Sequence, residues 1–248
     1  MTSPSSINEA KLNASEYTCR YLSTAFSESV IIGVGTGSTV KVFIEKCRDF
    51  LRSRLLVPSS LDTAITLASM GFTSIADPAV VDEIDVYVDG ADEVSRRLDL
   101  VKGRGGAFLR EKTLALRSKM RVYIVDYTKY TGASYLYAKP IPIEIIPISV
   151  KYTLRKLKEL GYGEPVIRAG SGKDGPIVSD NGNLIVDYHL VKPVENPLAF
   201  HNTLKLIHGV VETGIFPSEQ LVDMVVVGEP VSVRVLKPAG EYTGGQVA

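Results

Sequence analysis

The sequence predicts an α/β protein: a Rossmann-like, mostly parallel sheet with helices on both faces, together with a smaller α+β domain. Before residue 132, short apolar runs rich in β-branched residues alternate with segments of helical periodicity. Strands that alternate with helices favour a parallel sheet covered by helices. After residue 132 the pattern changes to proline-containing and glycine-rich segments with short strand-like runs, which is typical of a separate domain.

The larger domain is expected to comprise residues 1–134 and 209–248. Ser6 and Glu9 have the spacing of a capping box and predict a helix that runs to about Phe26. The later elements follow in chain order: strands at 30–34, 55–58, 84–89 and 122–126, and helices at about 40–51, 61–70 and about 107–119. Ser59 or Ser60 can cap the helix that begins at residue 61. The apolar runs 210–212 and 221–227 are expected to rejoin this sheet.

Residues 135–208 are expected to form the smaller domain. Its first segment, 139–147, carries three prolines and fits an edge strand or a crossing segment better than a central strand. The remaining elements are predicted as a helix at 150–160, strands at 166–169 and 183–188, and a helix at 198–207.

The composition bears on the class of partner and on the compartment. Lys+Arg and Asp+Glu both number 28, so the charge balance favours neither nucleic acid nor an anionic membrane. The apolar runs are too short to cross a bilayer, and the polar N-terminal segment lacks a signal core, so we expect a cytoplasmic protein. We interpret Cys19 and Cys47 as buried thiols kept reduced in that compartment. Zinc-type spacing is missing, so no metal is expected.

A glycine-rich turn runs from Gly33 to Thr39 between a predicted strand and a predicted helix. Free N–H groups and the dipole at a helix N-terminus favour an anion such as phosphate. The segment is neither a P-loop nor a complete dinucleotide fingerprint, because the GK[ST] ending is missing and Thr39 replaces the third glycine. The alternative is a plain turn with Ser38 as the helix cap, and this segment alone does not decide between the two.

An acidic turn, Asp89-Gly-Ala-Asp-Glu93, follows the strand at 84–89. Open α/β sheets bind their ligands at the carboxyl ends of the strands. Asp89 and Asp92 could act as acid and base or bind a divalent cation. Taken alone, the turn fits a solvated acidic loop better, because Asp and Gly are common turn residues.

The segment from Lys102 to Lys112 combines three glycines with both signs of charge. Lys102 and Arg104 would bring positive charge to an anion or to a developing oxyanion. Glu111 falls in the following helix and could point back toward the loop. Taken alone, Glu111 fits better as a surface residue paired with Arg110 or Lys112.

Lys129 follows the strand at 122–126 and could bind phosphate, although a solvated lysine is the simpler interpretation. The four segments are more informative together, because each follows a strand of the same predicted sheet. The carboxyl edge of a parallel sheet gathers such loops into one crevice. Lysines, carboxylates and a phosphate cradle in one crevice suit proton transfer next to a carbonyl.

At these residues the chain resembles the ribose-5-phosphate isomerases of type A. The matching motifs are GVGTGST (33–39), DGADE (89–93), KGRGGAFLREK (102–112) and VDYTK (125–129). Further similarity lies at 57–71, 179–188 and 209–216, so nearly the whole chain is covered. The resemblance implies interconversion of ribose 5-phosphate and ribulose 5-phosphate in the non-oxidative pentose phosphate pathway, without a cofactor, in a homodimer or homotetramer assembled through the smaller domain.

The resemblance also implies roles for single residues. Glu111 matches the base that moves a proton between C2 and C1 through an enediolate. Asp89 matches a carboxylate for ring opening and for proton transfer between sugar oxygens, with Asp92 as its neighbour. Lys102 matches the lysine that stabilises the oxyanion. Lys11 is placed near the phosphate. The positions that resemble substrate contacts are Thr36, Gly37, Ser38, Thr39, Gly90, Ala91, Gly103, Arg104, Gly105 and Lys129.

Arg104 departs from the family, many members of which have glycine there, and the stretch 189–201 follows the family less clearly. Three rival functions remain at this point. The first is another enzyme of the fold group, such as a sugar-phosphate deaminase or a coenzyme A transferase. The second is a non-catalytic sugar-phosphate sensor, which would be expected to have lost its catalytic carboxylates. The third is metal-dependent chemistry on Asp89 and Asp92.

Overall fold

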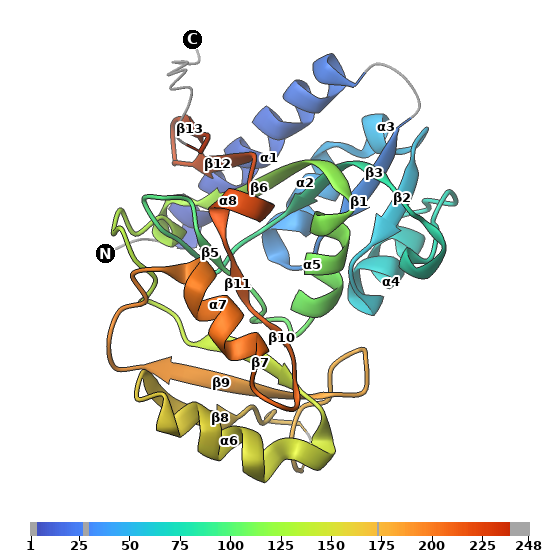
Figure 1. Cartoon of the computed structure of the whole chain (residues 1–248). Helices are drawn as coiled ribbons and strands as arrows, with labels where there is room; N and C mark the ends of the chain where they lie inside the picture. Colours follow the sequence, from blue (N-terminus) through green and yellow to red (C-terminus); the bar gives the residue numbers. More distant parts are fainter. Residues whose placement is uncertain (1–3, 27–29, 173, 239–248) are drawn as a thin grey trace. The chain divides into compact units, whose positions relative to one another are not determined.

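A computed structural model describes residues 4–26, 30–172 and 174–238, and Figure 1 shows its elements. Packing of the backbone divides the chain into two compact units. Unit 1 combines residues 1–91, 110–130 and 218–248, and unit 2 combines residues 92–109 and 131–217. Residues 134 and 209 stay predicted domain boundaries.

The centre of unit 1 is a six-stranded sheet in the order β13-β12-β6-β3-β1-β2. Its strands are β1 (Ile31–Val34), β2 (Leu55–Pro58), β3 (Ile84–Asp89), β6 (Ser118–Asp126), β12 (Met224–Gly228) and β13 (Val233–Leu236). Every neighbouring pair is parallel except β12 with β13, which is antiparallel at the edge. The predicted mostly parallel sheet is therefore confirmed.

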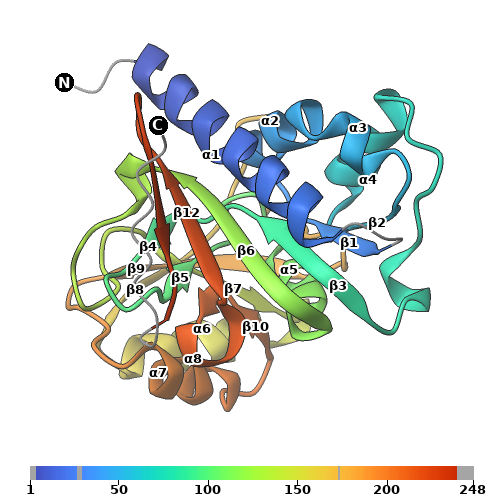
Figure 2. The same cartoon turned by 90° about the horizontal axis from the view of Figure 1, so that it is seen from above.

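Helices cover this sheet. They are α1 (Pro4–Ala25), α2 (Ser38–Lys46), α3 (Arg48–Leu51), α4 (Leu61–Ser69), α5 (Phe108–Leu116) and α8 (Ser218–Leu221), and Figure 2 shows α1 lying across the sheet on the face that carries α2 and α3. Val86, Val88 and Ile124 pack with residues of α1, α2, α3 and α4 in one buried cluster. Because side chains alternate along a strand, Tyr87 and Tyr123 point to the opposite face.

Two element boundaries in unit 1 differ from the predictions. Helix α1 already includes Pro4, so Ser6 lies inside the helix instead of capping it. Helix α5 ends at Leu116, and β6 begins at Ser118, although the helix was expected to reach about residue 119. The Ser118 hydroxyl donates to the Leu114 carbonyl at 2.7 Å, and Ser118 already pairs with Ile84 of β3. Pairing with a neighbouring strand therefore overrides the helical pattern.

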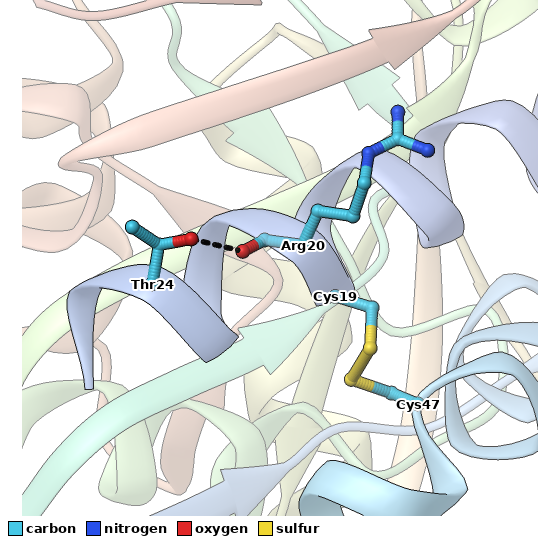
Figure 3. Close-up of a disulfide and its surroundings, with 4 residues drawn as sticks. All are labelled: Cys19, Arg20, Thr24 and Cys47. Carbon is cyan, nitrogen blue, oxygen red and sulfur yellow. Dashed lines mark hydrogen bonds between the residues drawn. A yellow bond between two sulfur atoms is a disulfide. The ribbon is translucent and has the colours of Figure 1, made fainter. Parts of the chain in front are cut away.

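The interpretation of the cysteines was wrong. Cys19 of α1 and Cys47 at the end of α2 form a disulfide, with their Cα atoms 5.2 Å apart (Figure 3). Cys47 is buried and Cys19 packs against the same core. The two cysteines are 28 residues apart in the sequence, and the packing of α1 on α2 brings their sulfur atoms together. Local sequence therefore does not predict the pairing.

Unit 2 contains two antiparallel sheets. The larger has the order β10-β7-β9-β8 and the smaller the order β11-β5-β4. Their strands are β4 (Glu93–Val94), β5 (Leu100–Val101), β7 (Ile141–Ile145), β8 (Gly163–Ile167), β9 (Leu184–Leu190), β10 (Val210–Thr213) and β11 (Ile215–Phe216). Helices α6 (Val150–Glu159) and α7 (Pro197–Lys205) complete the unit, and Figure 1 shows α6 beside β8. Leu157, Phe200 and Ile143 share one buried cluster.

Two predictions for this part of the chain are corrected. Strand β7 is central, not an edge or a crossing segment. Pro142 is tolerated there because it lies just beyond the last pair with β10, where its carbonyl accepts the N–H of Gly214 at 2.7 Å. The run 210–212 belongs to β10 of this sheet, so only the later apolar run rejoins the sheet of unit 1, as β12.

Among the residues described, no helix is both long and apolar enough to cross a membrane.

Candidate active site

Asp89 ends strand β3 and is completely buried. Its carboxylate accepts hydrogen bonds from the Tyr87 hydroxyl, from Thr36 N at 3.0 Å and from Gly90 N at 2.7 Å. Gly35 comes so close that an added Cβ would lie 2.0 Å from the Asp89 Cγ atom. The glycine loop after β1 is therefore fitted around this carboxylate, as expected for loops at one sheet edge.

Glu111 lies in the first turn of α5 and is only 4% exposed, so the interpretation as a surface residue is wrong. Burial raises the pKa of the Tyr87 hydroxyl well above its ordinary value, and the charges of Asp89 and Glu111 raise it further. Burial also raises the pKa of Tyr123, with Asp89 and Glu111 again contributing and Arg121 opposing. The charges of both carboxylates thus raise the pKa of the same two tyrosines, which lie on the sheet face opposite α1.

A cluster of hydroxyl groups holds the loop between β1 and α2. The Thr36 hydroxyl lies 2.9 Å from Ser59 Oγ, 2.8 Å from Ser60 Oγ and 3.2 Å from Thr63 Oγ1. The Thr63 hydroxyl in turn donates to the carbonyl of Gly35 at 2.7 Å. Ser60 also caps α4, as one of the two predicted candidates, by accepting Thr63 N at 3.0 Å.

The start of α2 differs in one respect from the plain-turn alternative, which had Ser38 as the helix cap. Gly37, with φ of 112°, is the N-cap of this helix, so Ser38 is not the cap. Lys11 reaches the same point from α1, because its Nζ atom donates to Ser38 Oγ at 3.0 Å. Hydroxyls, a lysine and the first turn of a nine-residue helix therefore meet beside Thr39, a combination that suits an anion.

Lys129 ends η2 (Tyr127–Lys129), the turn that follows β6. The Asp126 side chain caps this turn by accepting Thr128 N at 3.0 Å. The Tyr127 hydroxyl lies 3.2 Å from Ser6 Oγ on α1. The lysine is half-buried and belongs to the same sheet edge as Asp89.

Unit 2 carries the remaining predicted residues. Lys102 is 3% exposed, its backbone N–H donates to the carbonyl of Gly214 at 2.8 Å, and its Nζ atom lies 5.4 Å from the centre of the Phe216 ring. Asp92 accepts the backbone N–H of Arg104 at 3.0 Å. The Arg104 side chain is 82% exposed.

Gly103 in this loop has φ of 107°, and an added Cβ would lie 2.5 Å from the ring of Phe108. Glycine is therefore required there. Within unit 1 the structure brings together the loop 35–39, Asp89, Gly90 and Glu111. Within unit 2 it brings together Asp92 and the loop 102–106.

Sequence reasoning missed Tyr87 and the hydroxyl cluster of Ser59, Ser60 and Thr63. Tyr87 could have been noticed as a polar side chain inside an otherwise apolar buried strand. The serines were considered only as helix caps.

Within the described ranges, no three His, Cys, Asp or Glu side chains are grouped so that they could hold a metal ion.

Comparisons with known proteins agree on one family. The sequence model described as ribose 5-phosphate isomerase A (phosphoriboisomerase A) matches residues 55–231. Ribose-5-phosphate isomerase A of Aeropyrum pernix is 43% identical over 84% of this chain and 86% of its own length. Ribose-5-phosphate isomerase of Dictyostelium discoideum is 37% identical over 75% of this chain and 81% of its own.

Solved structures give the same result. Ribose 5-phosphate isomerase A of Methanocaldococcus jannaschii superimposes with a TM-score of 0.83 at 32% identity, covering 94% of this chain and all of its own. A D-ribose-5-phosphate isomerase in complex with phospho-erythronic acid gives 0.84 at 35% identity, with 93% and 99% covered. The fold and the site define an α/β enzyme with buried carboxylates at the carboxyl edge of a parallel sheet. The chain belongs to the ribose 5-phosphate isomerase A family.

Proposed function

We propose that this protein interconverts ribose 5-phosphate and ribulose 5-phosphate through an enediolate, with Glu111 as the base. Family membership supports the reaction. The observation that supports the residue assignment is the pair of buried carboxylates, Asp89 and Glu111, acting on the same two buried tyrosines. Such carboxylates at the carboxyl ends of parallel strands are suited to proton transfer on a small ligand.

The phosphate of the sugar is proposed to bind at the loop 36–39. The first turn of α2 offers backbone N–H groups and the positive end of its dipole. Lys11 and Ser38 are already joined by a hydrogen bond of 3.0 Å at this point, and Lys129 would add a second positive charge. An anchored phosphate lets binding energy orient the reacting end of the sugar.

Glu111 is proposed to remove the proton from C2 of the open-chain aldose. The electrons of that C–H bond form the C1–C2 double bond, and the carbonyl oxygen on C1 becomes the oxyanion of the enediolate. A proton passes from the hydroxyl on C2 to the oxygen on C1, and return of the carbon-bound proton to C1 then gives the ketose. Because Glu111 is only 4% exposed, bulk water has little access to the proton in transit.

Lys102 is proposed to stabilise the oxyanion, because a buried ammonium group is a strong electrostatic partner for developing negative charge. Asp89 would open the sugar ring and move protons between the sugar oxygens. Asp92, which accepts the N–H of Arg104, would hold the loop that carries Lys102. Gly90, Ala91, Gly103, Arg104 and Gly105 are the remaining proposed contacts.

The test is to incubate purified protein with ribose 5-phosphate alone and to follow ribulose 5-phosphate over time. Product should form without an added cofactor and equally well after exhaustive EDTA treatment. Lack of product would overturn the proposed function, and loss of activity on chelation would favour metal chemistry on Asp89 and Asp92. Amino-sugar phosphates and acyl-coenzyme A serve as rival substrates and should not be turned over.

The cellular setting is also a proposal. We expect the enzyme to act in the cytoplasm as a homodimer or homotetramer assembled through the smaller domain. Light scattering of the purified protein should give twice or four times the mass of 26.9 kDa. A monomeric mass at assay concentration would contradict this assembly.

A further inference from the structure

We propose that Arg168 and Asp187 form a positioning pair that sets the backbone of the Lys102 loop for catalysis. The inference rests on the proposed function, in which Lys102 stabilises the oxyanion. Arg168 lies outside the segments that resemble the family, and Asp187 lies in the segment 179–188, to which no role in the site was given. Arg168 directly follows β8 and Asp187 lies in β9.

The pair is geometrically fixed. Arg168 Nε donates to Asp187 Oδ2 at 2.8 Å, and its Nη2 donates to Oδ1, so both carboxylate oxygens are engaged. The side chains are only 13% and 19% exposed. The backbone fixes them as well, because Arg168 N donates to the carbonyl of Ile185 at 2.8 Å. A bidentate arginine–carboxylate pair is rigid, and a lysine cannot reproduce it.

The third guanidinium nitrogen, Nη1, reaches the Lys102 loop, residues 102–106. It donates to the carbonyl of Gly103 at 2.9 Å and to the carbonyl of Arg104 at 3.1 Å. Two successive peptide groups are therefore held by one cation. The residue before them in the chain is Lys102.

The first of these peptide groups is held at both ends. Its carbonyl, on Gly103, accepts from Arg168, and its N–H, on Arg104, donates to Asp92 at 3.0 Å. A positive group thus lies at the oxygen and a negative group at the hydrogen, which polarises and orients the peptide. The second carbonyl, on Arg104, belongs to the peptide whose N–H is on Gly105, one of the proposed substrate contacts.

A second contact supports the same loop from β9. An added Cβ on Gly106, with φ of 80°, would lie 2.9 Å from the Ile185 side chain. Ile185 and Asp187 are two residues apart on β9, so they project from the same face. One face of the four-stranded sheet of unit 2 therefore supports the Lys102 loop in two ways. Asp187 holds the Arg168 guanidinium that binds the loop, and Ile185 packs against Gly106.

The chain provides a matched control for purely structural effects. Arg121 and Asp223 form a similar pair in unit 1, with Nε to Oδ2 at 2.6 Å and Nη2 to Oδ1 at 2.9 Å. Asp223 lies before the first residue of β12, at the end of the parallel strands away from Asp89. Replacing this arginine removes an ion pair without touching the loop.

The experiment compares Arg168→Lys, Asp187→Asn and Arg121→Lys as full-length proteins, by steady-state kinetics on ribose 5-phosphate and by thermal unfolding. Arg168→Lys and Asp187→Asn should lower kcat roughly ten- to hundredfold, because small misplacement of a catalytic group has effects of this size. Their KM should change by a smaller factor than kcat, since the phosphate loop is unchanged and only the contacts of residues 103–105 are displaced. Arg121→Lys should keep the wild-type kcat.

Equal kcat values for Arg168→Lys and Arg121→Lys would overturn the proposal, as would a rise in KM without a fall in kcat. If Arg168→Lys does not fold, the kcat of Asp187→Asn is compared with that of Arg121→Lys instead. Asp187→Asn replaces only one carboxylate oxygen by an amide nitrogen. Wild-type protein that is inactive on ribose 5-phosphate would refute the proposed function instead, so the two failures are distinguishable.

Discussion

Tyr87 donates a hydrogen bond to Asp89 two residues further along β3, and both side chains are completely buried. The same carboxylate also accepts hydrogen bonds from Thr36 N and Gly90 N. The tyrosine therefore helps to fix the orientation of a proposed catalytic group.

Tyr87→Phe should destabilise the fold and slow the reaction. Removing one donor from a buried carboxylate costs about 1–3 kcal/mol, and kcat should fall because Asp89 loses part of its support. Urea unfolding and steady-state kinetics measure the two effects. Tyr21→Phe is the control, since the partner of that hydroxyl among the described residues is the Met120 sulfur at 3.9 Å. Equal behaviour of the two variants would contradict the role given to Tyr87.

Stability should fall at alkaline pH because of Tyr87 and Tyr123. Burial and the nearby carboxylates raise the pKa of both hydroxyls well above the ordinary 10.0 in the folded state. The unfolded chain therefore loses these protons first, and the stabilisation present below about pH 10 declines as the pH rises, by about 1.4 kcal/mol per pH unit and tyrosine. Urea unfolding between about pH 8 and 11 should give a shallower decline for Tyr123→Phe. Parallel curves for variant and wild type would refute the prediction.

Gly35→Ala should damage the site severely. The new Cβ would lie 2.0 Å from Asp89 Cγ and 2.5 Å from its Cβ, so either the loop or the carboxylate must move. We expect a higher KM and a lower kcat, because the loop 36–39 and Asp89 are displaced together. Gly172→Ala, where no atom of the described residues beyond its chain neighbours lies within 4 Å of the added atom, should behave as wild type. Wild-type kinetics for Gly35→Ala would show that the loop adapts.

Glu111→Gln should abolish most of the turnover while the protein stays folded. Loss of a general base typically costs a factor of roughly 10² to 10⁴ in kcat. The assay is ribulose 5-phosphate formation, with circular dichroism as the check on folding. Glu159→Gln, on the exposed end of α6, should keep full activity. Retention of wild-type kcat by Glu111→Gln would remove Glu111 from the mechanism.

The disulfide should contribute to stability. Closing a loop over 28 residues restricts the unfolded chain and is worth about 3–4 kcal/mol in the chain-entropy description. Reductant should therefore lower the unfolding temperature of the wild type. The Cys19→Ser, Cys47→Ser double variant should unfold at that lower temperature with or without reductant. A wild type that is indifferent to reductant would contradict the prediction.

The parallel sheet could be predicted because local signals agree with it. The apolar runs before Gly35 and Asp89 are short, β-branched and separated by helical segments, so their order suffices to predict neighbouring parallel strands. The positions of Asp89 and of the glycine loop at one sheet edge follow from the same pattern.

Other features depend on packing that local sequence does not encode. Glu111 is flanked by Arg110 and Lys112 and has the pattern of a surface residue, yet it is buried, and its charge raises the pKa of Tyr87 and Tyr123. Pro142 is acceptable in a central strand only because β10 ends before it. The cysteine pair required knowledge of how two helices pack, and Arg168 lies outside every motif.

The order of strands in unit 1 has a consequence for synthesis on the ribosome. Strand β12 lies between β6 and β13 in the sheet, yet nearly a hundred residues separate it from β6 along the chain. Until residues 224–228 have been made, β6 is left with an unpaired edge. The nascent chain therefore carries an open strand edge while the roughly one hundred residues after β6 are translated, and β12 closes that edge.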